Sequence, residues 1–294
     1  MNMDRSVVTI VDLPDEILLH ILKKLNNFDV LYSLVGLDEK LDRLACDISI
    51  TRFIDLMTIE SNRVTDSRSN ATLDRFCIKI LPRIHDKVES LTLQACFLSR
   101  VLHAANYLHL HKLVIINLEL SMACHIFNGM LFHLSISKKE LTQFFAFVVC
   151  FLEKSPFIHV FKEQISDLII TISDEIMDES NVKLLTDIYN RIFGLFTNLK
   201  YLDLDGDDIH VFSRSLLTGL SSTTCCSSSI VHLRIKMQNI DDCLYLLDGR
   251  LSQLNTLIIN LDYIHDPVQI RLRSQKIIRH SLKIMNNMVN NYIQ

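Results

Sequence analysis

Histidines and cysteines are the side chains of this sequence best suited to hold a metal ion, and several crowd into one stretch. This stretch contains Cys96, His103, His109, His111, Cys124, His125 and His133. Structural zinc sites usually space their ligands as CxxC pairs, and many zinc proteases carry HExxH. Neither spacing occurs in the chain. We therefore expect no metal and no other cofactor.

Acidic residues and glycines are the next candidates for chemistry. Asp203, Asp205, Asp207 and Asp208 surround Gly206, but the glycine and the distal glutamate of an EF-hand loop are misplaced. Phosphate loops, dinucleotide fingerprints and GxSxG elbows each need two or more glycines within a few positions. The chain has only 6 glycines, widely spaced, so it cannot form any of these motifs. We expect a protein that is not an enzyme.

The composition limits the partners and the compartment. The 294 residues are 49% hydrophobic and carry a net charge of −4, which gives no basic surface for nucleic acid. The longest apolar run, residues 144–152, is about half of what crossing a bilayer requires. The start of the chain lacks the pattern of a signal peptide, and the 8 scattered cysteines favour reduced thiols. We expect a cytoplasmic or nuclear protein that binds neither nucleic acid nor a membrane.

A repeated pattern, apolar-x-x-Leu-x-apolar, is the strongest signal of architecture. Its middle residues are Leu91, Leu113, Leu134, Leu168, Leu202, Leu233 and Leu257. Most of the segments between them have helical periodicity, so the pattern predicts strand–helix units that stack with parallel strands around a shared core. The alternative is a set of unrelated strands in an ordinary α/β domain.

These units resemble leucine-rich repeats. The family has an asparagine or cysteine three positions after the last core residue of each strand, and here only Cys96 occupies that position. The resemblance therefore implies an irregular α/β solenoid, which we place at residues 73–265. The polar residues 58–72 are expected to form a linker, and residues 266–294 a basic helix that either caps the solenoid or lies on a membrane surface; we favour the cap.

The N-terminal segment reads as three short helices. In DLPDEILLHILKKL, residues 12–25, Ile17, Leu18, Ile21, Leu22 and Leu25 are expected to share one helical face. Further helices are expected at about 30–35 and 39–45. So small a module has a thin core, which favours a partner that covers its remaining apolar residues.

This segment, residues 8–57, resembles the F-box, whose opening is matched by Leu13-Pro14-Asp15-Glu16-Ile17. The third helix departs from the family, because Leu41 stands where an aromatic is usual. The resemblance implies docking on the Skp adaptor, and through it on a cullin, within an SCF ubiquitin ligase. The residues expected to bind the adaptor are Leu13, Pro14, Ile17, Ile21, Leu25, Leu34, Leu37 and Leu41. The alternative is a non-catalytic interaction scaffold with no ligase role.

A target protein would then bind the solenoid. Side chains alternate across a strand, so the residues that flank each central leucine share the opposite face of the sheet. The residues expected to contact a target are Tyr201, Asp203, Asp205, His232, Arg234 and Lys236. The alternative for these residues is that Asp203 and Asp205 pair with Arg234 and Lys236 on the next strand.

Overall fold

The computed structural model describes residues 9–59, 67–119, 160–172, 192–194, 196–204, 229–237 and 251–261. The chain forms two compact units, Met1–Val114 and Ile115–Gln294, which we treat separately. The predicted strand around Leu134 and the predicted C-terminal helix, residues 266–294, lie outside the described residues.

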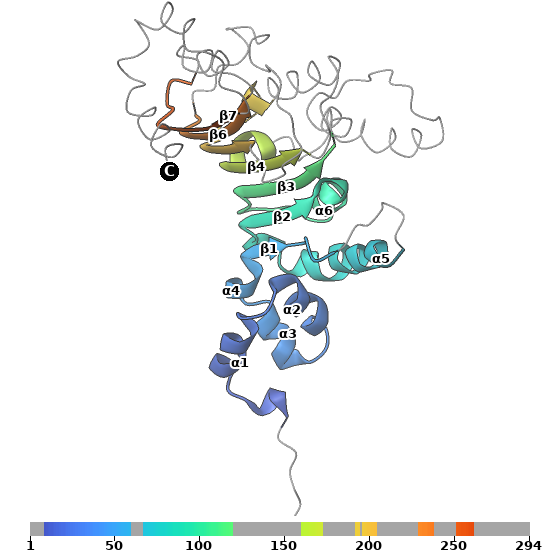
Figure 1. Ribbon diagram of the computed structural model, residues 1–294. Coiled ribbons are helices and arrows are strands. Elements are labelled where there is room, and N and C mark those ends of the chain that lie inside the picture. Colours follow the sequence, from blue (N-terminus) through green and yellow to red (C-terminus); the bar gives the residue numbers. More distant parts are fainter. Residues whose placement is uncertain are drawn as a thin grey trace, which may run out of the picture. The chain divides into compact units, whose positions relative to one another are not determined.

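The described strands confirm the α/β class with a parallel sheet. They are β1 (Phe53–Asp55), β2 (Ser90–Gln94), β3 (Lys112–Leu118), β4 (Asp167–Ile172), β5 (Tyr201–Leu204), β6 (His232–Met237) and β7 (Thr256–Leu261). Their order in the sheet is their order along the chain (Figure 1). Each of the pairs β1–β2, β4–β5, β5–β6 and β6–β7 is parallel.

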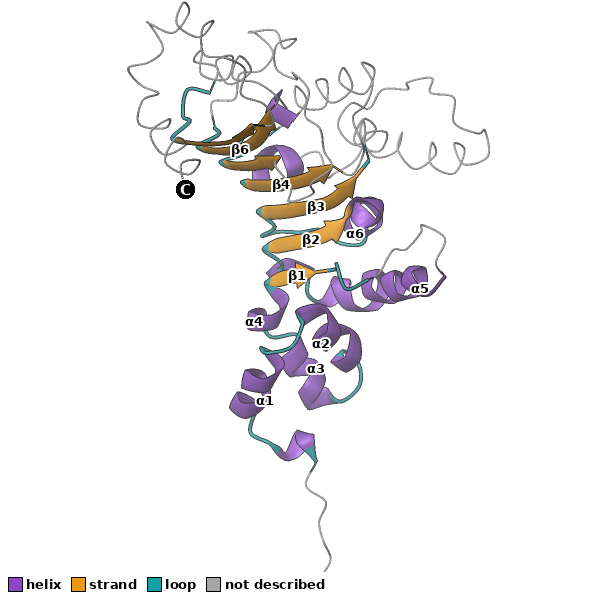
Figure 2. Ribbon diagram, in the orientation of Figure 1, coloured by secondary structure: helices purple, strands orange, loops and turns teal. Residues whose placement is uncertain are grey.

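In the first unit, a group of short helices precedes β1 (Figure 2). They are η1 (Ile10–Asp12), α1 (Asp15–Leu22), α2 (Asn27–Leu34), α3 (Glu39–Ala45) and α4 (Ile48–Thr51). Side-chain oxygens of Asn26, Asp38 and Asp47 accept backbone N–H groups at the starts of α2, α3 and α4. These caps satisfy N–H groups that have no partner within a helix, which explains why such short helices begin where they do.

Further helical segments follow β1 and β2 in the same unit. They are α5 (Ser67–Arg75), the π-helix η2 (Phe76–Ile80), η3 (Leu81–Arg83), η4 (His85–Lys87), η5 (Ala95–Phe97) and α6 (Leu98–His103). In the second unit, the π-helix η6 (Val160–Gln164) precedes β4.

The N-terminal helices pack directly on the segment that follows them. The ring of Phe28 on α2 lies 5.4 Å from that of Phe76 on η2, and both side chains are buried. The Asn27 amide donates a hydrogen bond of 2.9 Å to the carbonyl of Phe53 on β1. The Lys87 ammonium donates one of 2.8 Å to the carbonyl of Cys46. The first compact unit therefore contains these helices together with β1 and β2, and it extends past the predicted linker, residues 58–72.

The central leucines line up across neighbouring strands. Leu168, Leu202, Leu233 and Leu257 are register partners in succession along β4–β7, and all are buried. In the first unit, Ile54 is the register partner of Leu91. The repeated pattern does not predict the strand of Ile54, because its central residue is leucine and this strand has isoleucine there. Thr51, Ile54 and Leu56 occupy the three positions of the pattern, and they are 0%, 2% and 0% exposed.

A recurring hydrogen-bond arrangement precedes the strands. Directly ahead of β1, β2, β4, β5 and β6, the carbonyl two residues before the central apolar residue accepts two hydrogen bonds. The donors are the N–H groups of two successive residues at the start of the next strand. The carbonyls of Arg52, Glu89, Ser166, Lys200 and Val231 all do so, at 2.8–3.1 Å. Residues with different side chains thus repeat one backbone geometry, as expected of stacked units that satisfy each other's polar groups.

Candidate docking surface

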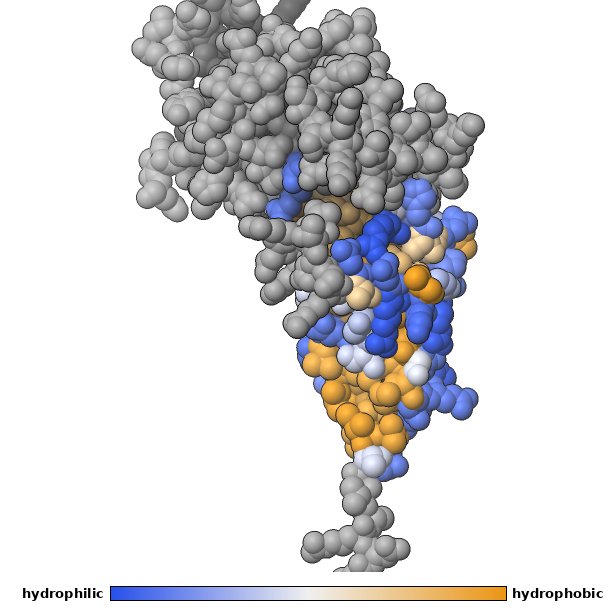
Figure 3. Space-filling view, turned by 90° about the vertical axis from the view of Figure 1, so that its right-hand side faces the viewer, coloured by the Kyte–Doolittle hydropathy of each residue, from blue (hydrophilic) through white to orange (hydrophobic). Residues whose placement is uncertain are grey.

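One face of α1 presents large apolar side chains to solvent. The exposed side chains are Ile17 and Ile21 on α1 and Leu25 in the turn directly after it, which together we call the α1 stripe. They follow one another at intervals of four residues and are 50%, 39% and 54% exposed. Leu37, after α2, is 69% exposed. Figure 3 shows hydrophobic residues gathered over the N-terminal helices, next to more hydrophilic parts of the surface. Clustered exposure of this kind is typical of interaction sites, whereas scattered apolar residues are not.

The α1 stripe exists because the apolar arc of this helix is too wide for one contact. Leu18 and Leu22 are 1% and 5% exposed and belong to the core. Each residue of a helix is rotated by about 100° from the one before, so residues directly preceding these two leucines face away from the core contact. The predicted single face is therefore divided into a buried row and an exposed row.

The start of α1 is held against α3. The Arg43 guanidinium lies 2.6 Å from the Asp15 carboxylate, and the Lys40 ammonium lies 3.4 Å from it. The Lys40 ammonium also donates hydrogen bonds of 2.9 and 2.7 Å to the carbonyls of Val11 and Leu13. The hydrogen bond from Arg43 lowers the pKa of the Asp15 carboxyl, and the one from Lys40 adds to this. The α1 stripe thus lies on a helix whose first turn is fixed by several polar contacts.

The residues expected to bind an adaptor do not all lie on the surface. Pro14 is exposed, while Leu13 and Leu34 are half-buried. Leu41 on α3 is only 6% exposed, so it packs within the helical core. Ile10 on η1, which the sequence did not single out, is 57% exposed. An apolar residue just before the LPDE segment is the signal that would have drawn attention to it.

The residues expected to contact a target meet on β5 and β6. Tyr201 and Asp203 are the register partners of His232 and Arg234. The Arg234 guanidinium lies 3.5 Å from the Asp203 carboxylate, which confirms this predicted cross-strand pair. The Tyr201 hydroxyl donates a hydrogen bond of 3.3 Å to the same carboxylate. Asp205 lies outside the described residues, and the structure describes only the backbone of Lys236.

This cluster is polar and partly withdrawn from solvent. Asp203 is 6% exposed, and the rings of Tyr201 and His232 lie 6.4 Å apart. Partial burial raises the pKa of Tyr201, and the nearby Asp203 carboxylate raises it further. Since Asp203 already has Arg234 and Tyr201 as partners, the arrangement is suited to hydrogen-bonded recognition by the more exposed His232 and Tyr201 side chains.

The described residues form neither a metal-binding cluster nor a membrane-spanning helix. Across the described ranges, no three histidine, cysteine or acidic side chains come together in a way that could hold a metal ion. His125 and His133 lie outside these ranges. No helix in the described portion has the length and apolar character needed to cross a membrane.

Comparison with known proteins adds no family assignment. No protein-family model matches the chain, and no curated protein matches its sequence.

Proposed function

We propose that this chain is the substrate-receptor subunit of an SCF ubiquitin ligase. Its N-terminal helices would act as the F-box and dock on the Skp adaptor, which connects them to a cullin. Its strands and the helices between them would form an irregular leucine-rich-repeat solenoid that binds a target protein. The observation that carries this proposal is the exposed α1 stripe directly after the LPDE segment.

The α1 stripe has the form expected of a helix-docking surface. Side chains four residues apart form a ridge along a helix, and such a ridge fits a groove between the helices of a partner. Fully burying an isoleucine or leucine contributes about 1.5–3 kcal/mol. Because Ile17, Ile21 and Leu25 are about half exposed, covering all three would contribute roughly 3 kcal/mol.

The solenoid proposal is supported by the stacking of like positions. Central apolar residues are aligned in register, and the same backbone hydrogen bonds recur at the strand entries. The opposite face of β5 and β6 carries Tyr201, His232 and Arg234, a combination suited to a protein or peptide target.

The contribution of the chain to ubiquitination would be proximity and not chemistry. Holding a target lysine beside a charged ubiquitin-conjugating enzyme converts an encounter in solution into an effectively intramolecular reaction. No residue of this chain is then required as a nucleophile or base. This role belongs to the cytoplasm or nucleus and involves neither nucleic acid nor a membrane.

One observation favours a second candidate, an interaction scaffold with no ligase role. Leu41 replaces the aromatic that the F-box family usually has in its third helix, and it is buried. The third helix therefore adds little at this position to an adaptor-binding surface. A scaffold of this kind would bind a target through its strands but recover the adaptor only at background level.

The decisive experiment is co-purification of the full chain with the Skp adaptor. Ile17→Asp/Ile21→Asp places carboxylates in the α1 stripe while leaving Leu18 and Leu22 in the core. Ile78→Asp is the matched control, because Ile78 lies on η2 and is 71% exposed. We expect wild type and control to recover adaptor equally, and the double variant to recover at least tenfold less (about 1.4 kcal/mol). Equal recovery by all three, or none by wild type, would contradict the proposal.

A further inference from the structure

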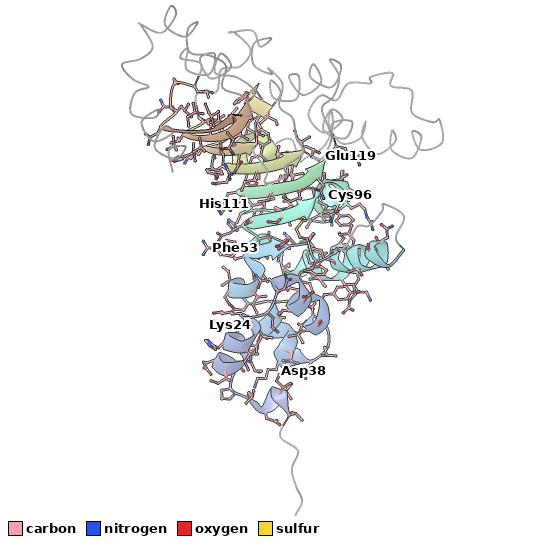
Figure 4. The ribbon with its side chains drawn as sticks, viewed as in Figure 1. Lys24, Asp38, Phe53, Cys96, His111 and Glu119 are labelled. Carbon is pink, nitrogen blue, oxygen red and sulfur yellow. The ribbon has the colours of Figure 1, made fainter. Side chains whose placement is uncertain are left out.

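The α1 stripe carries opposite charges at its two ends. Glu16 precedes Ile17, and Lys24 precedes Leu25; both charged side chains are exposed. In the part of the chain that the structure describes, neither forms an ion pair. Lys23 keeps right-handed helical angles (φ −63°, ψ −12°), and the N–H groups of Lys24 and Leu25 bond the carbonyls three residues earlier, so Lys24 lies in a tighter turn directly after α1. Figure 4 shows the Lys24 side chain at the outer edge of the N-terminal helices.

The nearby carboxylates of Asp15 and Asp47 already have partners. The Asp15 carboxylate is held by Arg43 and Lys40. The hydroxyl and backbone N–H of Ser49 lower the pKa of Asp47, and the positive charge of Lys23 contributes to this. Among the described residues, Glu16 and Lys24 are exposed charges beside the α1 stripe that form no ion pair, so both can pair with a second molecule.

Glu16 and Lys24 lie on the same flank of the α1 stripe. They are eight residues apart, which corresponds to about 12 Å along a helix. This separation exceeds the Debye length of about 8 Å at physiological ionic strength, so the two charges act largely independently in solvent. One flank of the α1 stripe is thus acidic at the end nearer Ile17 and basic at the end nearer Leu25.

We propose that, without adaptor, the α1 stripe pairs with the α1 stripe of a second copy of this chain in an antiparallel two-fold arrangement. Antiparallel packing brings the same flanks of two helices together. Glu16 of each copy then faces Lys24 of the other, and Ile21 lies near the two-fold axis. A two-fold interface must be complementary to itself, and this sequence of charges and apolar residues meets that requirement.

This inference rests on the proposed function, since it assigns a regulation to the same surface. One face cannot hold the adaptor and a second copy together, so self-association and adaptor docking are mutually exclusive. Because the ridge is short, the contact is far smaller than the interfaces of stable dimers. We therefore expect a weak dimer that shields the apolar residues and yields to a tighter partner.

Zero-length carbodiimide cross-linking of the full chain tests the arrangement. The reagent joins a carboxylate to an amine only when the two groups are in contact, with loss of one water. Glu16 and Lys24 of one copy are too far apart along the helix to react with each other. In an equal mixture of ¹⁴N- and ¹⁵N-labelled chain, we expect mixed-isotope Glu16–Lys24 peptides. Their lack at protein concentrations up to 0.5 mM, about the level a weak contact requires, would overturn the proposal.

Charge exchange provides a second test. Glu16→Lys and Lys24→Glu each place two like-charged pairs in the dimer, and each should weaken association about fivefold or more in sedimentation at low salt. The combined variant, Glu16→Lys/Lys24→Glu, restores opposite charges and should return to within about twofold of wild type. Lys79→Glu, on η2, is the charge-matched control for Lys24→Glu and should behave as wild type. Failure of the combined variant to recover would refute the pairing.

Adaptor binding, measured in parallel, separates this inference from the proposed function. If the adaptor binds but no mixed cross-link forms, self-pairing is wrong and the docking proposal stands. If mixed cross-links form but the adaptor does not bind, the docking proposal is wrong and the self-pairing stands.

Discussion

Replacing Asp42 with asparagine tests how much the ion pair between α3 and η3 stabilises the N-terminal helices against the segment after β1. The Asp42 carboxylate on α3 accepts two hydrogen bonds from the Arg83 guanidinium, at 2.7 and 2.5 Å. It also accepts the N–H of Gly36 at 2.7 Å. Gly36 has φ +82°, a backbone angle that side-chain-bearing residues rarely adopt. One carboxylate thus links α3, the turn after α2 and the end of η3.

The expected loss follows from the geometry and the exposure. Two-pronged, charge-assisted pairs are the strong class of hydrogen bond, but screening by solvent weakens exposed ones. The Asp42 side chain is 19% exposed and that of Arg83 is 45% exposed. We therefore expect Asp42→Asn to lower the free energy of unfolding by about 1 kcal/mol at pH 7. Asparagine keeps one oxygen for the Gly36 N–H, so most of the loss belongs to the ion pair.

The effect should depend on pH. The hydrogen bonds from Arg83, with a further contribution from the Gly36 N–H, lower the pKa of Asp42 from its ordinary value of 3.8. A carboxyl whose pKa is lower in the folded state stabilises the protein above its unfolded-state pKa. That stability is lost as the pH falls through the folded-state pKa. The difference between wild type and Asp42→Asn should therefore be full at pH 7 and shrink below about pH 4.

Urea unfolding followed by far-ultraviolet circular dichroism measures these quantities. Arg83→Gln completes a double-mutant cycle, in which we expect a coupling energy of about 1 kcal/mol at pH 7. A coupling below about 0.3 kcal/mol, which is within additivity error, would refute the reasoning. So would a difference between wild type and Asp42→Asn that grows as the pH is lowered from 7 to 3.

Two further predictions concern the core. Leu168→Ala removes a fully buried side chain and should lower the free energy of unfolding, measured in urea, by about 3 kcal/mol. Ile258→Ala changes a side chain that is 49% exposed and should lower it by less than about 1 kcal/mol. Similar losses for the two variants would contradict the assigned burial. Burial raises the pKa of Cys77 to about 11, so iodoacetamide at pH 8 should label this thiol only after unfolding, as read by peptide mass spectrometry. Labelling in the folded protein would show that this thiol is accessible.

The strands were the most predictable part of the fold. A leucine in the middle of a short apolar pattern located each described strand from β2 to β7, because the side chains at those positions are buried. The same rule missed β1, where Ile54 fills the central position and Thr51 the first. The Thr51 hydroxyl donates to the carbonyl of Asp47, which allows a polar residue to be fully buried there.

The docking surface was predictable in composition but not in orientation. Helical periodicity grouped Ile17, Leu18, Ile21 and Leu22 on one face, and only packing against the other helices decides which of them are covered. Leu41 shows the same limit, since a sequence resemblance placed it on a surface and the fold buries it. The hydrogen bond from Lys40 to Leu13 and the ion pair between Arg43 and Asp15 join residues distant in sequence, which helical periodicity cannot detect.

Hydrogen–deuterium exchange of the full chain with and without the Skp adaptor tests the central claim most directly. At a protein concentration low enough to keep the chain monomeric, we predict that adaptor slows exchange in peptides covering Asp15–Leu22 and Leu25. Peptides covering η2, which includes the exposed Ile78, should be unchanged. Adaptor that binds without slowing exchange in α1, or that does not bind, would contradict the account.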